Sequence, residues 1–174
     1  MAMTKPTDEP GEPLSMQQLH TPIGVLTLVG SDGGLRAVLW PDDNPERVAL
    51  GAVLRRSHAV LESAAEQLDG YFTGERRRFE MPLELVGTGF QVAVWRSLEE
   101  IPYGQTRSYA EVARLVGRPG AARAVGAAVG RNPVSILLPC HRVLGSDGSL
   151  TGFAGGVGAK RWLLDHEQIG GGHR

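Results

Sequence analysis

Two capping boxes in the second half of the chain constrain its fold more than any other feature. Thr88 and Gln91 form a T-x-x-Q pattern, and Ser108 and Glu111 form an S-x-x-E pattern. In such a box, two side chains satisfy backbone N–H groups at the start of a helix. We therefore expect helices to begin at these two places, and a third helix of small residues over 121–129.

The last two of these helices are separated by Gly117, which stands at a C-cap position, and by Arg118-Pro119-Gly120. Two short helices joined by a tight Gly/Pro turn match a helix-turn-helix, although many helical hairpins share the pattern. Between residues 103 and 142 there are six Arg and a single acid, Glu111. Such a stripe can be the footprint of a polyanion or an ordinary solvated face, so both readings stay open.

The first half carries strand signals instead. The segment Ser31-Asp32-Gly33-Gly34 separates two apolar runs and predicts a hairpin. Apolar residues at helical spacing predict a helix over 57–72. A stretch over 79–85 is expected to rejoin the sheet at an edge, because Pro82 cannot donate to a ladder. The main strands are expected at 24–29 and 35–40, with a third at 16–20.

Together these signals predict an α+β protein, with a small sheet-plus-helix unit followed by a mostly helical domain. The expected divisions are a disordered Pro-rich tail (1–15), an N-terminal domain (16–87), a C-terminal domain (88–169) that ends in a helix near 159–168, and a flexible tail (170–174). No 18-residue apolar stretch and no signal-peptide run occur, so we expect no membrane span and a cytoplasmic protein.

Cys140 is the single cysteine, within Pro139-Cys140-His141-Arg142. One cysteine forms no internal disulfide and is too few for a cysteine-based zinc site. It is therefore either a small buried hydrophobe or a nucleophile. The basic pair that follows favours the nucleophile, because adjacent positive charge lowers the pKa of a thiol.

The segment 121–130 is nearly all Ala, Gly and Val apart from Arg123. Gly126 inside a helix costs ~1 kcal/mol relative to Ala, so something must compensate. Either a neighbouring helix or a nucleic acid approaches closely. A helix without long polar side chains reads base edges poorly and suits sequence-independent contact in a narrow groove.

Several motifs in order resemble one family, the O6-alkylguanine-DNA alkyltransferases. The resemblance covers roughly residues 87–167, and the N-terminal unit more loosely. The motifs are Ile101-Pro102-Tyr103-Gly104, Ser108-Tyr109, Ala121-Ala122-Arg123-Ala124-Val125-Gly126, Asn132-Pro133 and Pro139-Cys140-His141-Arg142-Val143.

The resemblance implies direct-reversal DNA repair, in which an O6-alkylguanine is flipped out of the duplex and its alkyl group moves irreversibly to a protein cysteine, once per molecule. O4-alkylthymine is a second expected substrate. The implied partner is double-stranded DNA, bound through the minor groove largely without sequence preference. No cofactor is implied, and the protein is expected to be a monomer in solution that is able to cooperate on DNA.

The resemblance also implies roles for individual residues. Cys140 is the acceptor, His141 the base acting through a water, and Glu167 the carboxylate that orients His141. Asn132 bridges the active-site turn and the recognition helix, and Tyr109 donates toward the guanine ring. The implied DNA-binding residues are Arg123, which fills the vacated stack, Tyr109, Ala122, Gly126, Arg118 and Ser146. The implied substrate pocket comprises Val143, Phe153, Ala154 and Gly155.

Two features depart from the family pattern. Many relatives carry Tyr-Ser where this chain has Phe153-Ala154, so the substrate range is less defined than the reaction. Some relatives bind zinc through N-terminal Cys and His. This N-terminal half has only His20 and His58, so we expect no metal.

Three other functions compete with this one. A lesion-binding protein of the alkyltransferase-like type replaces the acceptor cysteine, which Cys140 contradicts. A cysteine hydrolase needs a histidine paired directly with the thiol, and adjacent residues in extended chain point apart. A helix-turn-helix regulator needs base-reading side chains that the Ala/Gly helix lacks.

Overall fold

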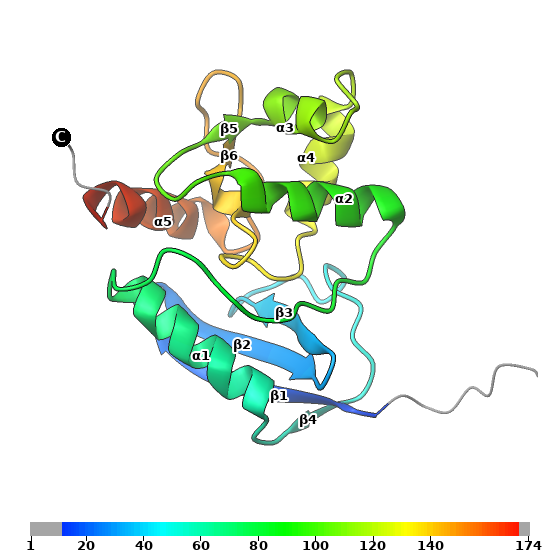
Figure 1. Cartoon of the computed structure of the whole chain (residues 1–174), viewed down its shortest axis with the longest axis vertical. Coiled ribbons are helices and arrows are strands. Elements are labelled where there is room, and N and C mark those ends of the chain that lie inside the picture. Colours follow the sequence, from blue (N-terminus) through cyan, green and yellow to red (C-terminus); the bar gives the residue numbers. More distant parts are fainter. Residues whose placement is uncertain (1–11, 171–174) are drawn as a thin grey trace, which may run out of the picture.

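The computed structural model describes residues 12–170. The N-terminal unit, residues 12–87, is a four-stranded sheet with one helix across it (Figure 1). The strands lie in the order β3-β2-β1-β4. Their bounds are Leu14–Thr21 for β1, Gly24–Ser31 for β2, Gly34–Leu39 for β3 and Val53–Arg55 for β4, and α1 spans Ala59–Phe72.

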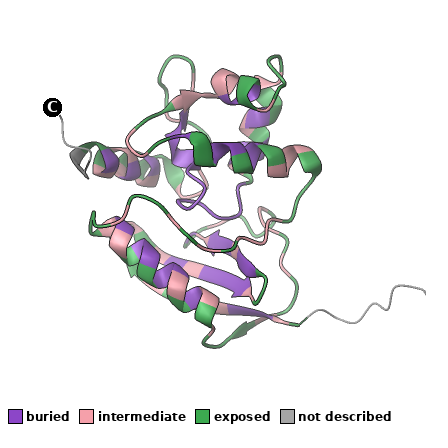
Figure 2. Ribbon diagram, viewed as in Figure 1, coloured by how far each residue is buried: buried purple, intermediate pink, exposed green. Residues whose placement is uncertain are grey.

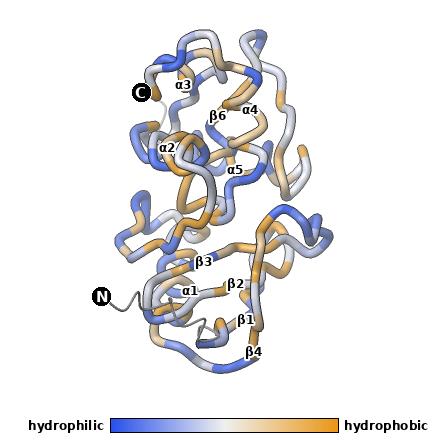
Figure 3. Tube along the Cα trace, turned by 90° about the vertical axis from the view of Figure 1, so that its right-hand side faces the viewer, coloured by the Kyte–Doolittle hydropathy of each residue, from blue (hydrophilic) through white to orange (hydrophobic). Residues whose placement is uncertain are grey.

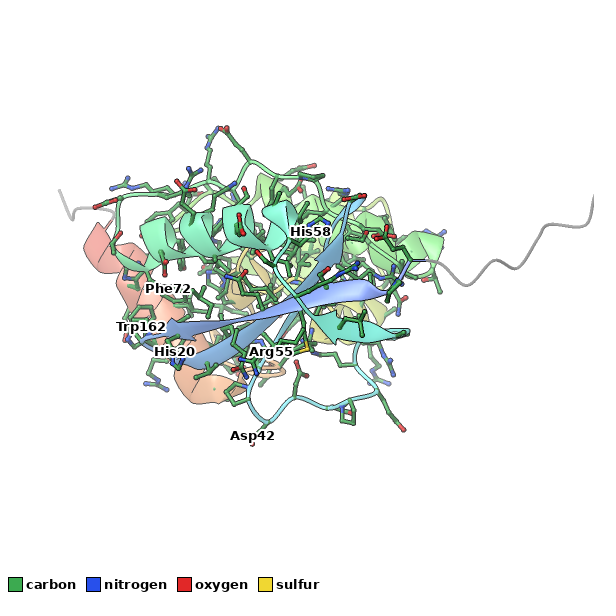
Figure 4. The ribbon with its side chains drawn as sticks, turned by 90° about the horizontal axis from the view of Figure 1, so that it is seen from below. His20, Asp42, Arg55, His58, Phe72 and Trp162 are labelled. Carbon is green, nitrogen blue, oxygen red and sulfur yellow. The ribbon has the colours of Figure 1, made fainter. Side chains whose placement is uncertain are left out.

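The expected hairpin is confirmed, because β2 and β3 pair antiparallel, with a register shift at Val29/Gly30. β1 pairs antiparallel with β2, as Met16 opposite Val29 illustrates. Leu26 and Leu28 on β2 are fully buried with Leu61 of α1. Seen from below, α1 lies across the strands on one face of the sheet (Figure 4). Burial of these alternate positions holds the sheet and α1 together.

Three predictions for the N-terminal unit need correction. β1 begins at Leu14, inside the expected tail, because Leu14 pairs in parallel with Val53 of β4 and is buried. The strand β4 was not anticipated, since three residues are too few to show a period. The 79–85 stretch forms a single parallel bridge, Leu35 to Leu83, rather than a strand. The expected tail otherwise lies outside the described residues.

The C-terminal unit, residues 88–170, is mostly helical (Figure 1). Both capping boxes are present, at Thr88 before α2 and at Ser108 before α3. The expected helix of small residues is α4, which packs on α3, and Val125 and Val112 from these helices are buried in the same core. The helix bounds are Gly89–Ser97 for α2, Tyr109–Leu115 for α3, Ala122–Gly130 for α4 and Gly156–Gly170 for α5. Two short strands, β5 (Arg107–Ser108) and β6 (Val143–Leu144), pair in parallel.

The last helix is longer than expected. α5 starts at Gly156 rather than near residue 159, and it includes Gly170, where we expected a tail to begin. Gly156 opens the helix with a φ of 86°, a left-handed conformation that glycine adopts without strain. Gly158 disfavours a helix by about 1 kcal/mol relative to Ala, and packing of the fully buried Leu163 offsets this cost. Residues 171–174 lie outside the described part of the chain.

One buried segment joins the two units. Every residue from 132 to 143 is buried, and Figure 2 shows this stretch as a purple chain between the sheet and α2. Val38 on β3 donates its backbone N–H to the Pro133 carbonyl at 2.8 Å. At the other end of the interface, Phe72 of α1 lies against Trp162 of α5, with ring centroids 5.7 Å apart (Figure 4). The side view shows the units stacked one above the other, with hydrophilic segments mainly in outlying loops (Figure 3). The sheet therefore serves as a platform under the cysteine segment.

Candidate active site

Cys140 opens a 3-10 turn, Cys140–Arg142, at the end of the buried segment. Its backbone N–H donates to the Leu138 carbonyl at 2.8 Å, and only 4% of the residue is exposed. Four residues earlier, Ile136 has a φ of 76°. A buried β-branched residue in the left-handed region is strained, and such strain persists only where surrounding structure holds it. The cysteine is therefore carried on a tightly packed turn.

The turn corrects one premise about His141. We expected extended chain at this point, but residues 140–142 are helical. The conclusion still holds that Cys140 and His141 do not bond directly. The Nε2 atom of His141 lies 2.7 Å from Oε1 of Glu167, and its Nδ1 atom is buried with no hydrogen-bond partner among residues 12–170. With Nε2–H donating to Glu167, the Nδ1 lone pair is free to accept a proton.

Glu167, on the last turns of α5, accepts five hydrogen bonds in the interior. Three reach Oε1, from Tyr71 Oη (2.8 Å), His141 Nε2 (2.7 Å) and Arg142 Nη2 (2.9 Å). Two reach Oε2, from Arg142 Nε (2.9 Å) and the Gly104 backbone N–H (3.2 Å). The Arg142 pair is bidentate, the strongest geometry for such a contact.

These contacts set the protonation states. Burial raises the pKa of Glu167, but the hydrogen bonds and charges of His141 and Arg142 outweigh burial and hold that pKa well below its usual range. Burial lowers the pKa of His141, and the opposing pull of Glu167 does not restore it. The pair is thus a carboxylate and a neutral imidazole, the form able to act as a base.

The environment of the thiol differs from the one inferred from sequence. Burial raises the pKa of Cys140. The Asn132 and Ser135 side chains, and the charges of Lys160 and Arg47, lower that pKa in part. The adjacent basic pair is not the source of help, because His141 is neutral and Arg142 is neutralised by Glu167. The activating cations come from elsewhere in the chain.

Asn132 links the cysteine turn to α4. Its Nδ2 donates to the Leu138 carbonyl at 2.8 Å, and its Oδ1 accepts from the Val134 backbone N–H at 3.1 Å. Its own backbone N–H donates to Val129 of α4 at 3.1 Å. The structure therefore brings together Cys140, Asn132, His141 and Glu167. Of these, Asn132 touches both the turn and the helix.

The expected DNA-facing residues lie on or beside α3 and α4. The ring of Tyr109 lies against Gly126, since a Cβ added there would sit 3.7 Å from Cδ1 of Tyr109. The Tyr109 hydroxyl donates to the Thr151 carbonyl at 3.3 Å. Arg123 is exposed and makes no ion pair or hydrogen bond within the described chain. Arg118 and Ser146 are also exposed, whereas Ala122 is half-buried.

The expected pocket residues come from the start of β6, directly after the cysteine turn, and from the loop that precedes α5. Val143 is fully buried, whereas Phe153, Ala154 and Gly155 are half-buried. Phe153 meets Trp40 edge-on, with ring centroids 5.3 Å apart. Gly155 packs directly on the indole, because an added Cβ would lie 2.6 Å from a Trp40 ring atom. Trp40 of the N-terminal unit therefore braces the loop that carries Phe153 and Gly155.

Four residues of this site were not identified from sequence. Lys160 is buried, and its Nζ donates to the Val143 carbonyl (2.6 Å) and the Thr151 carbonyl (3.0 Å). Arg47 donates to the Asn132 carbonyl and to Val38 O (2.9 Å) and pairs with Asp43. Trp40 donates its indole N–H to Ser135 Oγ at 3.2 Å. Tyr71 is the fourth. One signal was available: Lys160 is a cation on the apolar side of the last predicted helix.

Side chains of the metal-ligand types do not gather into a site in the part of the chain that the structure describes. Within residues 12–170, no group of three or more His, Cys, Asp or Glu side chains is placed to hold a metal ion. His58 caps α1 through Nδ1 and pairs with Asp32 through Nε2, far from His20 (Figure 4). The same part of the chain contains no helix of the length and apolarity that a bilayer crossing requires.

Comparisons with known proteins match nearly the whole chain. The family model described as "6-O-methylguanine DNA methyltransferase, DNA binding domain" matches residues 89–169, and the companion "ribonuclease-like domain" model matches residues 16–85. The methylated-DNA–protein-cysteine methyltransferase of Mycolicibacterium paratuberculosis is 45% identical over 155 residues, which cover 89% of this chain and 93% of the relative. The corresponding protein of Methanosarcina barkeri is 43% identical over 150 residues, covering 86% and 94%.

Solved structures agree with these sequence matches. The crystal structure of Mycobacterium tuberculosis OGT in complex with DNA superposes with a TM-score of 0.80 and 43% identity, covering 90% of this chain and 94% of that one. The M. tuberculosis O6-methylguanine methyltransferase structure gives a TM-score of 0.79 and 44% identity, covering 90% and 93%.

Proposed function

Since this chain belongs to the 6-O-methylguanine DNA methyltransferase family, we propose that Cys140 is the thiol that accepts the alkyl group. The activity is direct-reversal DNA repair by alkyl transfer to a protein cysteine. The observation that carries the assignment is the hydrogen-bonded set of His141 and Glu167 next to the one thiol of the chain.

The chemistry is displacement at a saturated carbon. A new S–C bond forms to Cys140 while the bond between that carbon and guanine O6 breaks, and the thiol proton finally resides on the guanine. A thiolate is the required nucleophile, and free cysteine is mostly protonated at neutral pH. The Nδ1 atom of His141 is the base for this proton, by way of a water, and Glu167 orients the ring by accepting a hydrogen bond from Nε2.

The leaving oxygen must be stabilised as it gains negative charge. We assign this role to the Tyr109 hydroxyl, which lies beside the loop that follows Cys140 and donates to the Thr151 carbonyl in this structure. A positioned O–H donor that shares its proton with the leaving group lowers the barrier. The half-buried Phe153 and Ala154 supply the apolar wall of the substrate pocket.

Exposure and charge on α4 support minor-groove binding. Arg123 is exposed and has no ion-pair partner among residues 12–170, and Gly126, one turn later, adds no side chain to the helix surface. We assign Arg123 to the space left by the extruded nucleotide, where a guanidinium plane can stack. We assign contacts with the DNA phosphate backbone to Arg118, Ala122 and Ser146. The affinity for DNA should therefore fall steeply with salt and depend little on the DNA sequence.

The proposal is tested by the mass and stoichiometry of the product. Mixed with duplex DNA that contains O6-methylguanine, the protein should gain one methyl mass on the peptide with Cys140, and repair should stop at one lesion per molecule. Cys140→Ala should bind the same DNA and repair none. Repair by Cys140→Ala, or multiple turnovers by the parent, would overturn the assignment.

Four further expectations from the sequence stay predictions. They are action on O4-alkylthymine, a monomer in solution that cooperates on DNA, a cytoplasmic location, and the lack of a cofactor or metal.

A further inference from the structure

Tyr71 connects the N-terminal unit to the candidate catalytic carboxylate. It lies on α1, is fully buried, and donates its hydroxyl to Oε1 of Glu167 at 2.8 Å across 96 residues of sequence. The other two side chains that donate hydrogen bonds to Glu167, those of His141 and Arg142, both come from the cysteine turn. Tyr71 is thus the one donor to this carboxylate that the N-terminal unit supplies among the described residues.

The carboxylate has no unused acceptor capacity. An ionised carboxylate offers about four lone-pair sites, and Glu167 accepts five hydrogen bonds. Three of these hydrogen bonds are accepted by Oε1. Tyr71 and His141 therefore donate to the same oxygen atom and compete for its negative charge. A change in the Tyr71 contact must therefore be felt at His141.

Packing of the Tyr71 ring against neighbouring aromatic rings holds its hydroxyl in place. Its ring lies at centroid distances of 5.4 Å from Phe72, 5.7 Å from Phe79 and 5.3 Å from His166. Its backbone carbonyl is 2.7 Å from His166 Nε2 on α5. Burial, and then the negative charge of Glu167, raises the pKa of Tyr71, so the hydroxyl keeps its proton at any working pH. It is a fixed and permanent donor.

We propose that Tyr71 is a positioning residue for alkyl transfer, which holds Glu167 and through it the His141 ring in the orientation that accepts the thiol proton. This inference rests on the proposed roles of His141 and Glu167. It makes the N-terminal unit a working part of the reaction rather than only a support for the fold.

The direction of the effect follows from the shared oxygen. Without the Tyr71 hydroxyl, Oε1 of Glu167 keeps more of its negative charge, and that charge raises the pKa of His141. When the pKa of His141 is higher, protonation removes it as a base already at a higher pH. The acidic limb of the pH–rate profile should therefore move upward, and the carboxylate should also be held less firmly.

The test compares Tyr71→Phe with Tyr103→Phe. Tyr103 packs in the same cluster of aromatic side chains, and its ring centroid lies 6.2 Å from that of Tyr71. Its hydroxyl, however, has no hydrogen-bond partner in the described chain. Both variants keep a ring and lose one oxygen. Rates of alkyl transfer are measured from pH 5 to 9 on free O6-methylguanine and on alkylated duplex, corrected for the fraction of protein that can be alkylated at all.

For Tyr71→Phe we expect transfer to be about tenfold slower at neutral pH, by the same factor on both substrates, with the acidic limb moved up by about one unit. DNA affinity should not change, and Tyr103→Phe should overlay the parent. A Tyr71→Phe profile that overlays the parent, while Glu167→Gln is slow, would overturn the role of Tyr71 and leave the His141–Glu167 pair standing. If Glu167→Gln overlays the parent too, the pair itself is wrong.

A second variant tests the proposal in case Tyr71→Phe does not fold. Site-specific 3-fluorotyrosine at position 71 keeps the ring and hydroxyl but makes the O–H a stronger donor. The acidic limb should then move to lower pH. An unmoved limb would overturn the proposal.

Discussion

Replacing Lys160 with Met should disable the thiol without disabling the fold. The Lys160 ammonium is buried between two backbone carbonyls, of Val143 at 2.6 Å and Thr151 at 3.0 Å, and makes no ion pair with a carboxylate in the described chain. Burial lowers the pKa of Lys160, and the negative charge of Cys140 raises it. The charge of this lysine is therefore compensated only when the thiolate forms.

The expected magnitudes follow from these contacts. Losing two charge-assisted hydrogen bonds costs ~3–6 kcal/mol, but Met of similar length also removes the several kcal/mol spent on burying an ion. We expect the free energy of unfolding to change by less than ~2 kcal/mol. The Cys140 thiolate loses one of the two cations that lower its pKa, so that pKa should rise by about one unit, which is ~1.4 kcal/mol and about tenfold less thiolate at pH 7.

The assay uses the single cysteine. The rate of Cys140 alkylation by iodoacetamide, and the rate of methyl transfer from DNA, are measured against pH for Lys160→Met. Both should be about tenfold lower at pH 7 and should recover as the pH passes the raised pKa. Arg161→Met is the matched control, because Arg161 is the adjacent residue on the same helix and is exposed. Profiles of Lys160→Met that overlay those of Arg161→Met would refute the reasoning.

Three further outcomes are expected. Arg123→Ala should slow repair of duplex DNA much more than reaction with the free base, and Arg123→Lys should recover little; equal losses on both substrates would refute the role in base flipping. Glu167→Gln should destabilise folding by ~3–5 kcal/mol in urea titrations, since a buried guanidinium loses its carboxylate. The folded pKa of Glu167 is lowered, so its stabilising effect is present above about pH 4.3 and is lost as the pH falls through the folded value, and the variant should lack this acid dependence. Gly155→Ala should slow transfer because its Cβ would collide with Trp40, whereas Gly158→Ala, with no atom within 4 Å, should not.

Local signals allowed much of the fold to be predicted. The capping boxes at Thr88 and Ser108 lie at the starts of α2 and α3, because a cap is encoded within four residues. The turn signal around Asp32 lies between β2 and β3 for the same reason. The strand β4 gave no such signal, since its pairing of Val53 with Leu14 depends on a distant segment.

The residues of the site also fall into those that a local motif identifies and those that only the fold brings together. The motif around Cys140 identified the thiol, and its resemblance to a family brought in Asn132, His141 and Glu167. The supports for these groups come from segments with no motif. Trp40 follows a strand, and Tyr71 occupies an apolar helix position that reads as core. Their hydroxyl and indole groups become informative only when the fold brings them to the cysteine turn.

The joining of the two units at the cysteine turn has a consequence for how such a protein can change over generations. Trp40, Arg47 and Tyr71 belong to one half of the gene, whereas Ser135, Asn132 and Glu167, which they contact, belong to the other. A recombinant that joins the first half of one relative to the second half of another inherits each half of these contacts separately. Even where both halves fold, the hybrid keeps a working thiol only if the three contacts match. The two halves therefore form one unit of inheritance, although they are separate units of architecture.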